Sequence, residues 1–277
     1  MADSTPLSAV ERRIRTAYSS YNHRYHPTET TMYFNLGYWG PGCTSLDDAC
    51  HALADMLADA AGMREGDQVL DVGFGYADED LRWAELRRPQ RIVGLNITPA
   101  QVQVAMKRAR ERGLEDRLDL RVGSATEMPF DAGTFDRVVA LQSAFHFDTR
   151  QDFFAEAYRV LRPGGVLATV DVVLRGTAGR AFAETEASAC CVPVANRYDQ
   201  NTYRERMCEA GFVNVGIRPI SDHVYEPLIG YLTDRLERYK AERVRSVKLL
   251  MTESLIANMR KAIPAMEYVI AVGETRT

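Results

Sequence analysis

Between Asp67 and Asp171 short apolar segments alternate with amphipathic ones, and this alternation limits the possible folds more than any other feature of the chain. Strands are predicted at 68–72, 91–95, 118–122, 135–141 and 166–171, and helices at 78–87, 99–112 and 150–161. Strands and helices that follow one another in this way are typical of a parallel sheet wrapped by helices. We therefore expect an α/β fold for this part of the chain.

The segments outside the alternating core are expected to cap it. Before the core, a helix is predicted over 7–21 and another over 45–62, which opens with Ser45 as N-cap. After the core, helices are predicted at 178–190 and 199–210, strands at Val213–Ile217 and Glu267–Val272, and a charged helical region at 228–262. This divides the chain into an N-terminal helical cap, 1–62, and a core, 63–277, with lid insertions at about 176–210 and 228–262. The caps should lie at the carboxyl ends of the strands, where such sheets bind ligands.

Composition and charge limit the cellular location and the binding partners that we expect. The formal net charge of −4 and the pI of about 5.8 argue against an electrostatic grip on nucleic acid and against a polybasic membrane anchor. The sequence has no run of about 18 apolar residues, and its first residues lack the apolar stretch of a signal peptide. The cysteines are odd in number without CxxC spacing, and the histidines have no metal-ligand spacing. We expect a soluble, cytoplasmic protein without disulfide framework or metal.

The turn after the first predicted strand is the strongest local signal. It reads Val69-Leu-Asp-Val-Gly73-Phe-Gly75, a strand followed by two glycines and then a helix. Glycines at such a turn let the backbone approach a nucleotide-like ligand. The third glycine of the dinucleotide fingerprint is missing, because Asp78 stands at its position, and the acidic run 78–80 would repel a pyrophosphate. This disfavours NAD and FAD, and with them a nicotinamide dehydrogenase.

Further segments accompany this turn in a characteristic order. They are Asn35-Leu-Gly-Tyr-Trp39, Gly94-Leu-Asn-Ile-Thr-Pro-Ala-Gln101, Gly123-Ser-Ala-Thr-Glu-Met-Pro-Phe130, Phe135-Asp136 and Arg159-Val-Leu-Arg-Pro-Gly-Gly165. Together they make the chain resemble the class I S-adenosylmethionine-dependent methyltransferases, most of all the branch that decorates sugars, polyketides and terpenoids. The resemblance implies a seven-stranded, mostly parallel Rossmann-like sheet whose last strand, 267–272, runs antiparallel beside 213–217. It also implies S-adenosyl-L-methionine as cofactor and a small-molecule acceptor.

The resemblance assigns roles along the cofactor. Gly73 and Gly75 would pass beneath its methionine part, with Asp71 orienting the loop or the ammonium group. Asn96 and Gln101 would hold the ribose, as in cyclopropane-synthase-like enzymes, where most of the superfamily has a carboxylate. Ser124 stands where an Asp often binds the adenine amino group, so a neutral hydrogen bond would replace a charged one. The remaining residues expected at the cofactor are Asn35, Ile97, Ala125, Thr126 and Gln142.

His146 and Asp171 are the expected catalytic residues. His146 follows the fourth predicted strand and Asp171 is predicted to end the fifth, so both belong to the carboxyl edge of the sheet. In the sugar O-methyltransferases that the chain resembles, a His and an Asp at these places are proposed to deprotonate the acceptor hydroxyl. An alcohol is a poor nucleophile until its proton is leaving, and an imidazole accepts a proton near neutral pH. We expect O-methylation with His146 as general base and Asp171 orienting it or sharing the role.

Aromatic residues near the core leave two alternatives open. The expected substrate contacts are Tyr18, Tyr21, Tyr38, Trp39 and Phe145, although such residues more often pack a cap onto a core. If the substrate is a prenyl chain, aromatic faces would stabilise a carbocation, and the chain would be a C-methyltransferase that needs a cation for a diphosphate. The other alternative is a cyclase that keeps the cofactor only as structure. The N-terminal helix also offers a surface for a homo-oligomer.

Overall fold

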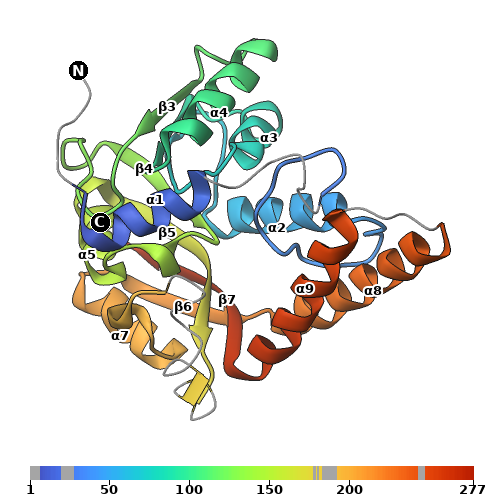
Figure 1. The fold of residues 1–277 in the computed structure, drawn as a ribbon. Coiled ribbons are helices and arrows are strands. Elements are labelled where there is room, and N and C mark those ends of the chain that lie inside the picture. Colours follow the sequence, from blue (N-terminus) through green and yellow to red (C-terminus); the bar gives the residue numbers. More distant parts are fainter. Residues whose placement is uncertain (1–6, 20–27, 177–178, 180, 183–191, 243–246) are drawn as a thin grey trace.

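A seven-stranded sheet forms the centre of the molecule, in the order β3-β2-β1-β4-β5-β7-β6 (Figure 1). The computed structural model describes residues 7–19, 28–176, 179, 181–182, 192–242 and 247–277. The strands are β1 (Gln68–Val72), β2 (Arg91–Asn96), β3 (Leu118–Val122), β4 (Phe135–Leu141), β5 (Leu161–Leu174), β6 (Val213–Pro219) and β7 (Met266–Glu274). The first five are parallel, whereas β7 lies antiparallel between β5 and β6. The predicted sheet, including its antiparallel last strand, is confirmed.

Helices cover both faces of the sheet (Figure 1). They are α1 (Ala9–Ser19), α2 (Leu46–Ala60), α3 (Asp78–Leu86), α4 (Pro99–Glu111), α5 (Arg150–Val160), α7 (Gln200–Glu209), α8 (Tyr225–Ala241) and α9 (Val247–Ala262). Successive strand residues point to opposite faces. Val69 therefore packs in a core with α2, α3, α4, α8 and α9, and Leu70 in a second core with α5 and α7. Among the described helices, none is long and apolar enough to cross a bilayer.

Capping residues set where the helices beside the site begin. Before α2, the Ser45 hydroxyl accepts from the backbone N–H of Asp48, and the Asp48 carboxylate accepts from the backbone N–H of Ser45. Thr149 and Asp152 form the same capping box before α5. An N-cap of this kind stabilises a helix by about 1 kcal/mol. The capping box at Thr149 therefore determines where α5 begins, and so where the loop after β4 that carries His146 ends.

The predicted helical region 228–262 consists of two helices, because α8 ends at Ala241 and α9 returns beside it (Figure 1). β5 differs from its prediction, because it continues past Asp171 and pairs Val172, Val173 and Leu174 with β7. The helix predicted over 178–190 lies largely outside the described residues. The boundary predicted at residue 62 stays a prediction, although α2 shares its core with β1.

Candidate active site

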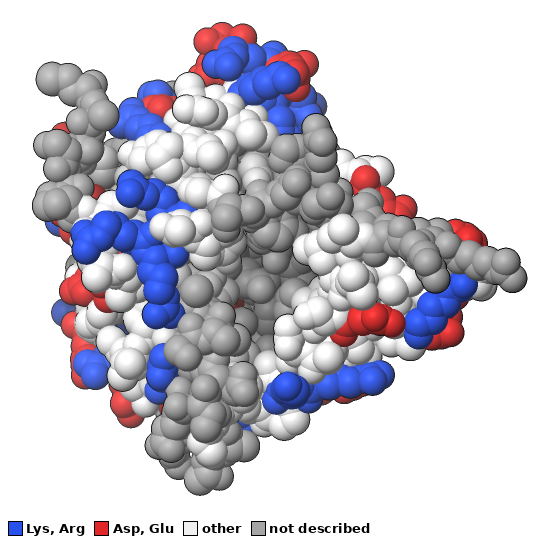
Figure 2. Space-filling view, viewed as in Figure 1, with Lys and Arg blue, Asp and Glu red and all other residues white. Residues whose placement is uncertain are grey.

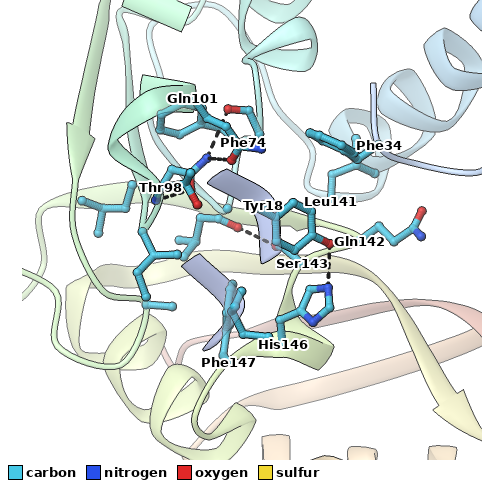
Figure 3. A pocket seen from close by; sticks show the side chains of 18 of the residues that line it. Tyr18, Phe34, Phe74, Thr98, Gln101, Leu141, Gln142, Ser143, His146 and Phe147 are labelled. Carbon is cyan, nitrogen blue, oxygen red and sulfur yellow. Dashed lines mark hydrogen bonds between the residues drawn. The ribbon is translucent and has the colours of Figure 1, made fainter. Parts of the chain in front are cut away.

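A cavity lies at the carboxyl ends of the central strands, next to α1 (Figure 3). Its walls come from the loops after β1, β2, β3 and β4, from residues 32–35 and from one side of α1. The chain runs from β1 outward to β3 and then returns to β4 on the other side of β1. The cavity is therefore at the point where the strand order reverses, the usual ligand site in open α/β sheets.

The turn between β1 and α3 forms the first wall. Gly73 and Gly75 have φ angles of +90° and +55°, which L side chains rarely adopt. A Cβ atom on Gly73 would lie 2.4 Å from the Cβ of Ser143, in the loop after β4. Ser143 also donates its hydroxyl to the carbonyl of Val72 at 2.7 Å. Glycine at position 73 is thus required by contact between the two loops, independently of any ligand.

Amide side chains at the end of β2 and in the first turn of α4 form the second wall. Asn96 donates its amide to the carbonyl of Gly75 at 3.1 Å and to Oε1 of Gln101 at 3.0 Å. Within the described residues, the amide nitrogens of Gln101 and of Asn35, another wall residue, have no hydrogen-bond partner. A buried N–H group without a partner is costly. Both amides therefore fit a ligand that offers oxygen acceptors.

The end of β3 forms the third wall and is joined to α1. Ser124 donates its hydroxyl to Oε1 of Glu11 at 2.5 Å and accepts from the backbone N–H of Thr126 at 3.2 Å. Glu11, Ala125 and Thr126 line the cavity, whereas Ser124 itself does not. The N-terminal helix thus contributes a carboxylate to a wall that is otherwise built from the loop after β3.

His146 ends a short 3-10 turn, η2 (Ala144–His146), directly after β4. Its Nε2 lies 2.8 Å from the hydroxyl of Tyr18 in α1, and the two rings meet edge to face (Figure 3). Both residues line the cavity, as does Ile14, which is buried on the same helix. α1 therefore lines the cavity both beside the loop after β3, through Glu11, and beside His146, through Tyr18.

Asn196, far along the chain, holds the loop that carries His146. Its amide donates to the carbonyl of Phe145 at 3.2 Å and to that of Phe147 at 2.7 Å, the two neighbours of His146. Its Oδ1 accepts from the backbone N–H of Arg150 at 2.9 Å. Asn196 is only 2% exposed, so these bonds are shielded from water. The segment after β5 thus fixes the backbone on both sides of His146.

Asp171 is buried away from the cavity wall, in an ion pair with Arg150. Its Oδ2 lies 2.9 Å from Nε of Arg150, and both side chains are 0% exposed. Burial raises the pKa of Asp171, and the guanidinium of Arg150 opposes this shift. Because β5 continues to Leu174, the prediction that Asp171 ends the strand is wrong. The extra strand length places its side chain in the interior of the fold, beside α5.

Asp71 also lies outside the cavity wall, in a cluster of buried acids with Glu79 and Asp80. Burial raises the pKa of Asp71, and Asp80 raises it further. Burial likewise raises the pKa of Asp80, to about 7. Two neighbouring carboxyl groups in such a place are stabilised when they share a proton. Asp78 is instead held by Arg108 in two bonds of 2.6 and 2.7 Å. The run 78–80 therefore carries less negative charge than its sequence indicates.

A second, mostly apolar cavity adjoins the first, and Gln142 lines both. Its other lining residues are Leu36, Phe145, Val172, Val192, Tyr225, Met259, Ala262, Ile263 and Met266. Oε1 of Gln142 accepts from the backbone N–H of Leu36 at 3.0 Å and from the hydroxyl of Tyr268. The hydroxyl of Tyr225 is buried without a partner among the described residues. Figure 2 shows one face of the molecule, which is hollowed near its centre and carries its charged side chains mostly at the periphery.

Comparisons with known proteins agree with this geometry. The family described as "Methyltransferase domain" matches residues 70–169, the segment that builds the walls at β1, β2, β3 and β4. The erythromycin 3''-O-methyltransferase of Saccharopolyspora erythraea is 42% identical over 271 residues, which cover 94% of this chain and 89% of that protein. The chain belongs to the class I S-adenosylmethionine-dependent methyltransferases. Its cofactor is S-adenosyl-L-methionine, whose oxygen atoms fit the amides of Gln101 and Asn35, which are buried without a partner among the described residues.

Other relatives put this methyltransferase among those of natural-product biosynthesis. The 27-O-demethylrifamycin SV methyltransferase of Amycolatopsis mediterranei is 28% identical over 240 residues, 84% of this chain and 86% of that protein. The solved structure of the [4+2]-cyclase SpnF has a TM-score of 0.76 at 23% identity and covers 98% of both chains. A geranyl diphosphate C-methyltransferase from Streptomyces coelicolor A3(2) has a TM-score of 0.71 at 19% identity and covers 98% of this chain and 99% of that one. These two structures share the fold.

The cavity of the methyltransferase brings together most of the predicted site residues. Those that line it are Tyr18, Asn35, Gly73, Gly75, Asn96, Ile97, Gln101, Ala125, Thr126, Gln142 and His146. Phe145 lines the second cavity instead. Tyr38 and Trp39 line neither, because Tyr38 stacks on His223 and Trp39 packs at a tilt against Tyr231, with ring centroids 4.6 and 5.0 Å apart. Tyr21 lies outside the described residues.

Several wall residues were not predicted. They include Glu11, Ile14, Met32, Tyr76, Glu79, Thr98 and Ser143. A signal for Glu11 is present in the sequence, because Ser8-Ala-Val-Glu11 has the spacing of a capping box. In the structure Ser8 and Glu11 bond each other in that way. The signal predicts where α1 begins, but not which wall its acidic residue reaches.

Proposed function

We propose that this methyltransferase methylates a hydroxyl group of a natural-product acceptor, with His146 as general base. The observation that carries the proposal is the Tyr18 hydroxyl, 2.8 Å from Nε2 of His146 inside the cofactor cavity. A hydroxyl oxygen can thus occupy a position within hydrogen-bond reach of the imidazole, as proton transfer requires. An acceptor hydroxyl in this position would lose its proton to His146 while it attacks the methyl group.

The other residues in the cavity would bind and orient. When bound, S-adenosyl-L-methionine supplies a methyl group on a sulfonium. Asn96 and Gln101 would hold the ribose, and the amide of Asn35 would bind an oxygen of the same molecule. Asp71, buried beside Asp80, would support the glycine turn without touching the cofactor. Asp171 would hold Arg150, and through Arg150 the loop of His146, in place of the general-base role expected from the sequence.

The second cavity would receive the apolar body of the acceptor. Its lining is almost entirely apolar, and it meets the cofactor cavity at Gln142. The unpaired hydroxyl of Tyr225 would bind a polar group on that body. The relatives that act on erythromycin and rifamycin intermediates, by their names, support an acceptor of this size and chemistry. We therefore propose a polyketide antibiotic intermediate with a free hydroxyl group as the acceptor class.

Three acceptors test this proposal. Purified enzyme with S-adenosyl-L-methionine is given 3''-O-demethylerythromycin, 27-O-demethylrifamycin SV or geranyl diphosphate with Mg²⁺. We expect S-adenosylhomocysteine release and a product with a new O-methyl group from one of the first two. A new C-methyl group on geranyl diphosphate would instead favour the isoprenoid alternative. Conversion of an acceptor without S-adenosylhomocysteine release would favour a cyclase.

The variant His146→Ala tests the general base. We expect turnover to fall by about 100- to 10,000-fold, because the acceptor hydroxyl loses its proton acceptor. Binding of S-adenosylhomocysteine, measured by calorimetry, should change little and serves as the control for folding. Full turnover in His146→Ala would exclude His146 as the general base. O-methylation would then be supported only by the product of the acceptor experiment.

The class of binding partner, the cellular location and the oligomeric state are proposals as well. The net charge of −4 supports a small-molecule acceptor over nucleic acid, and the bacterial biosynthetic relatives support a cytoplasmic location. A homo-oligomer through α1 is still a prediction. The face of α1 that carries Ile14, Glu11 and Tyr18 is turned to the cavity, so such a contact would use its other faces.

A further inference from the structure

Glu11 lies in the wall of the cofactor cavity and has no role in the proposed methyl transfer. Its Oε1 accepts from the Ser124 hydroxyl at 2.5 Å, and its Oε2 accepts from the backbone N–H of Ser8 at 2.8 Å. No ion pair joins Glu11 to a cation in the part of the chain that the structure describes. A carboxylate has about four acceptor positions on its two oxygens, so Glu11 retains capacity for further donors.

The position of Glu11 along the sheet edge points to one part of the cofactor. The strands beside the cavity follow one another as β3, β2, β1 and β4. His146 follows β4, whereas Asn96 ends β2 and Gln101 lies beside it in the first turn of α4. A cofactor with its reacting end near His146 and its ribose near Asn96 extends its base toward the end of β3. Glu11, Ala125 and Thr126 line the cavity there.

We propose that the carboxylate of Glu11 accepts a hydrogen bond from the exocyclic amino group of adenine. The inference rests on the cofactor placement in the proposed function. The end of β3 carries Ser124, whose single hydroxyl proton is already donated to Glu11. α1 therefore supplies the charged acceptor that the loop after β3 lacks. Recognition of the base and docking of α1 over the cavity then depend on the same side chain.

This arrangement predicts selectivity for the 6-amino group of the purine. In a hypoxanthine analogue an oxygen replaces that amino group, and it would face the Glu11 carboxylate without a donor between them. A site that is built to bind a hydrogen-bond donor rejects analogues that lack it, because its own buried acceptor is left unpaired. The wild-type protein should bind S-adenosylhomocysteine about 10- to 100-fold more tightly than S-inosylhomocysteine.

Calorimetric titration of both ligands into three proteins tests the inference. In Glu11→Gln the preference should fall to about threefold or less, because an amide can accept from the amino group or donate to the oxygen. The matched control is Ser8→Ala, which removes the other half of the capping box and lies outside the cavity wall. That variant should keep the wild-type preference, even if both ligands bind somewhat more weakly.

An unchanged preference in Glu11→Gln, with equal weakening of both ligands, would overturn the inference, since Glu11 would then only hold α1 in place. Wild-type protein that binds neither ligand would overturn it together with the cofactor placement. No acceptor is present in this assay. A failure of O-methylation or of the His146 role therefore leaves the result for Glu11 unaffected, and the two failures are distinguishable.

Discussion

Asp71 and Asp171 lie on strands of the same sheet and are both 0% exposed, yet their surroundings have opposite charge. Asp71 has Asp80 and Glu79 as neighbours, and its pKa is raised by burial and then by these acids. Asp171 has Arg150, which opposes the effect of burial on its pKa. A buried carboxyl beside other acids is stabilised by holding a proton, whereas one beside a guanidinium is stabilised by losing it.

The comparison teaches that an acidic residue near the end of a strand is not by its position a functional residue. Neither side chain lines the cavity. Asp71 belongs to the cluster under the glycine turn, and Asp171 belongs to a network with Arg150 and Asn196 that ends at the loop of His146. Their neighbours along and across the fold decide what each carboxyl does.

The largest expected effect comes from breaking the pair at Asp171. Arg150→Met should lower the free energy of unfolding by about 3–5 kcal/mol, because a carboxylate is then left buried without its partner. Chemical denaturation measures this loss. Adding Asp171→Leu should restore most of it, since an apolar pair replaces an ion pair. If the double variant is as unstable as Arg150→Met, the bonds of Arg150 to backbone carbonyls matter more than its charge.

The cluster at Asp71 should produce a pH dependence. The pKa of Asp80 is raised from 3.8 to about 7 in the folded protein. Its contribution to stability is therefore fully present below pH 3.8 and is lost as the pH rises through about 7. The free energy of unfolding should fall by roughly 2–4 kcal/mol over this range.

Denaturation at a series of pH values tests this prediction with two variants. Asp80→Asn should flatten the profile in this range, because the shared proton is no longer needed. The exposed control Glu115→Gln should leave the profile as in the wild type. A flat wild-type profile between pH 4 and 7 would show that Asp71 and Asp80 do not hold a proton in the folded state.

A smaller effect is expected from the residue that joins the network of Asp171 to His146. Asn196→Ala removes the bonds to the carbonyls of Phe145 and Phe147. We expect kcat to fall by about 10- to 100-fold, because small displacements of a catalytic group are costly. KM for S-adenosyl-L-methionine should change little. The exposed Asn201→Ala, in the same segment, is the control. A rise in KM as large as the fall in kcat would indicate general loosening of the fold.

The cofactor half of the molecule could be predicted from the sequence. The bounds of β1, β3 and β4 coincide with the predicted ones, because each is a short run, apolar or alternating between apolar and polar residues, that lies between turns. The wall residues Gly73, Gly75, Asn96 and Gln101 lie in local motifs whose spacing along the chain decides their spacing in the fold. Motifs of this kind need no knowledge of distant contacts.

The second cavity and the contacts of α1 could not be predicted in the same way. The second cavity joins Leu36, Phe145, Tyr225 and Met259, which are remote in sequence and belong to no common motif. The contact of Glu11 with Ser124 also depends on where α1 docks. Asp171 was misplaced for a related reason, since the length of β5 depends on its pairing with β7.

The position of β7 between β5 and β6 has a consequence for the synthesis and folding of the chain itself. A ribosome delivers β6 before β7, so β6 has no partner strand until residues 266–274 have emerged. At roughly 5–20 residues per second this interval lasts some seconds. During this interval the edge of β5 that later pairs with β7 is open to other chains. Leu167, Ala168 and Val170 of this strand are fully buried in the finished protein. The sheet can therefore be completed only after residues 266–274 have emerged from the ribosome.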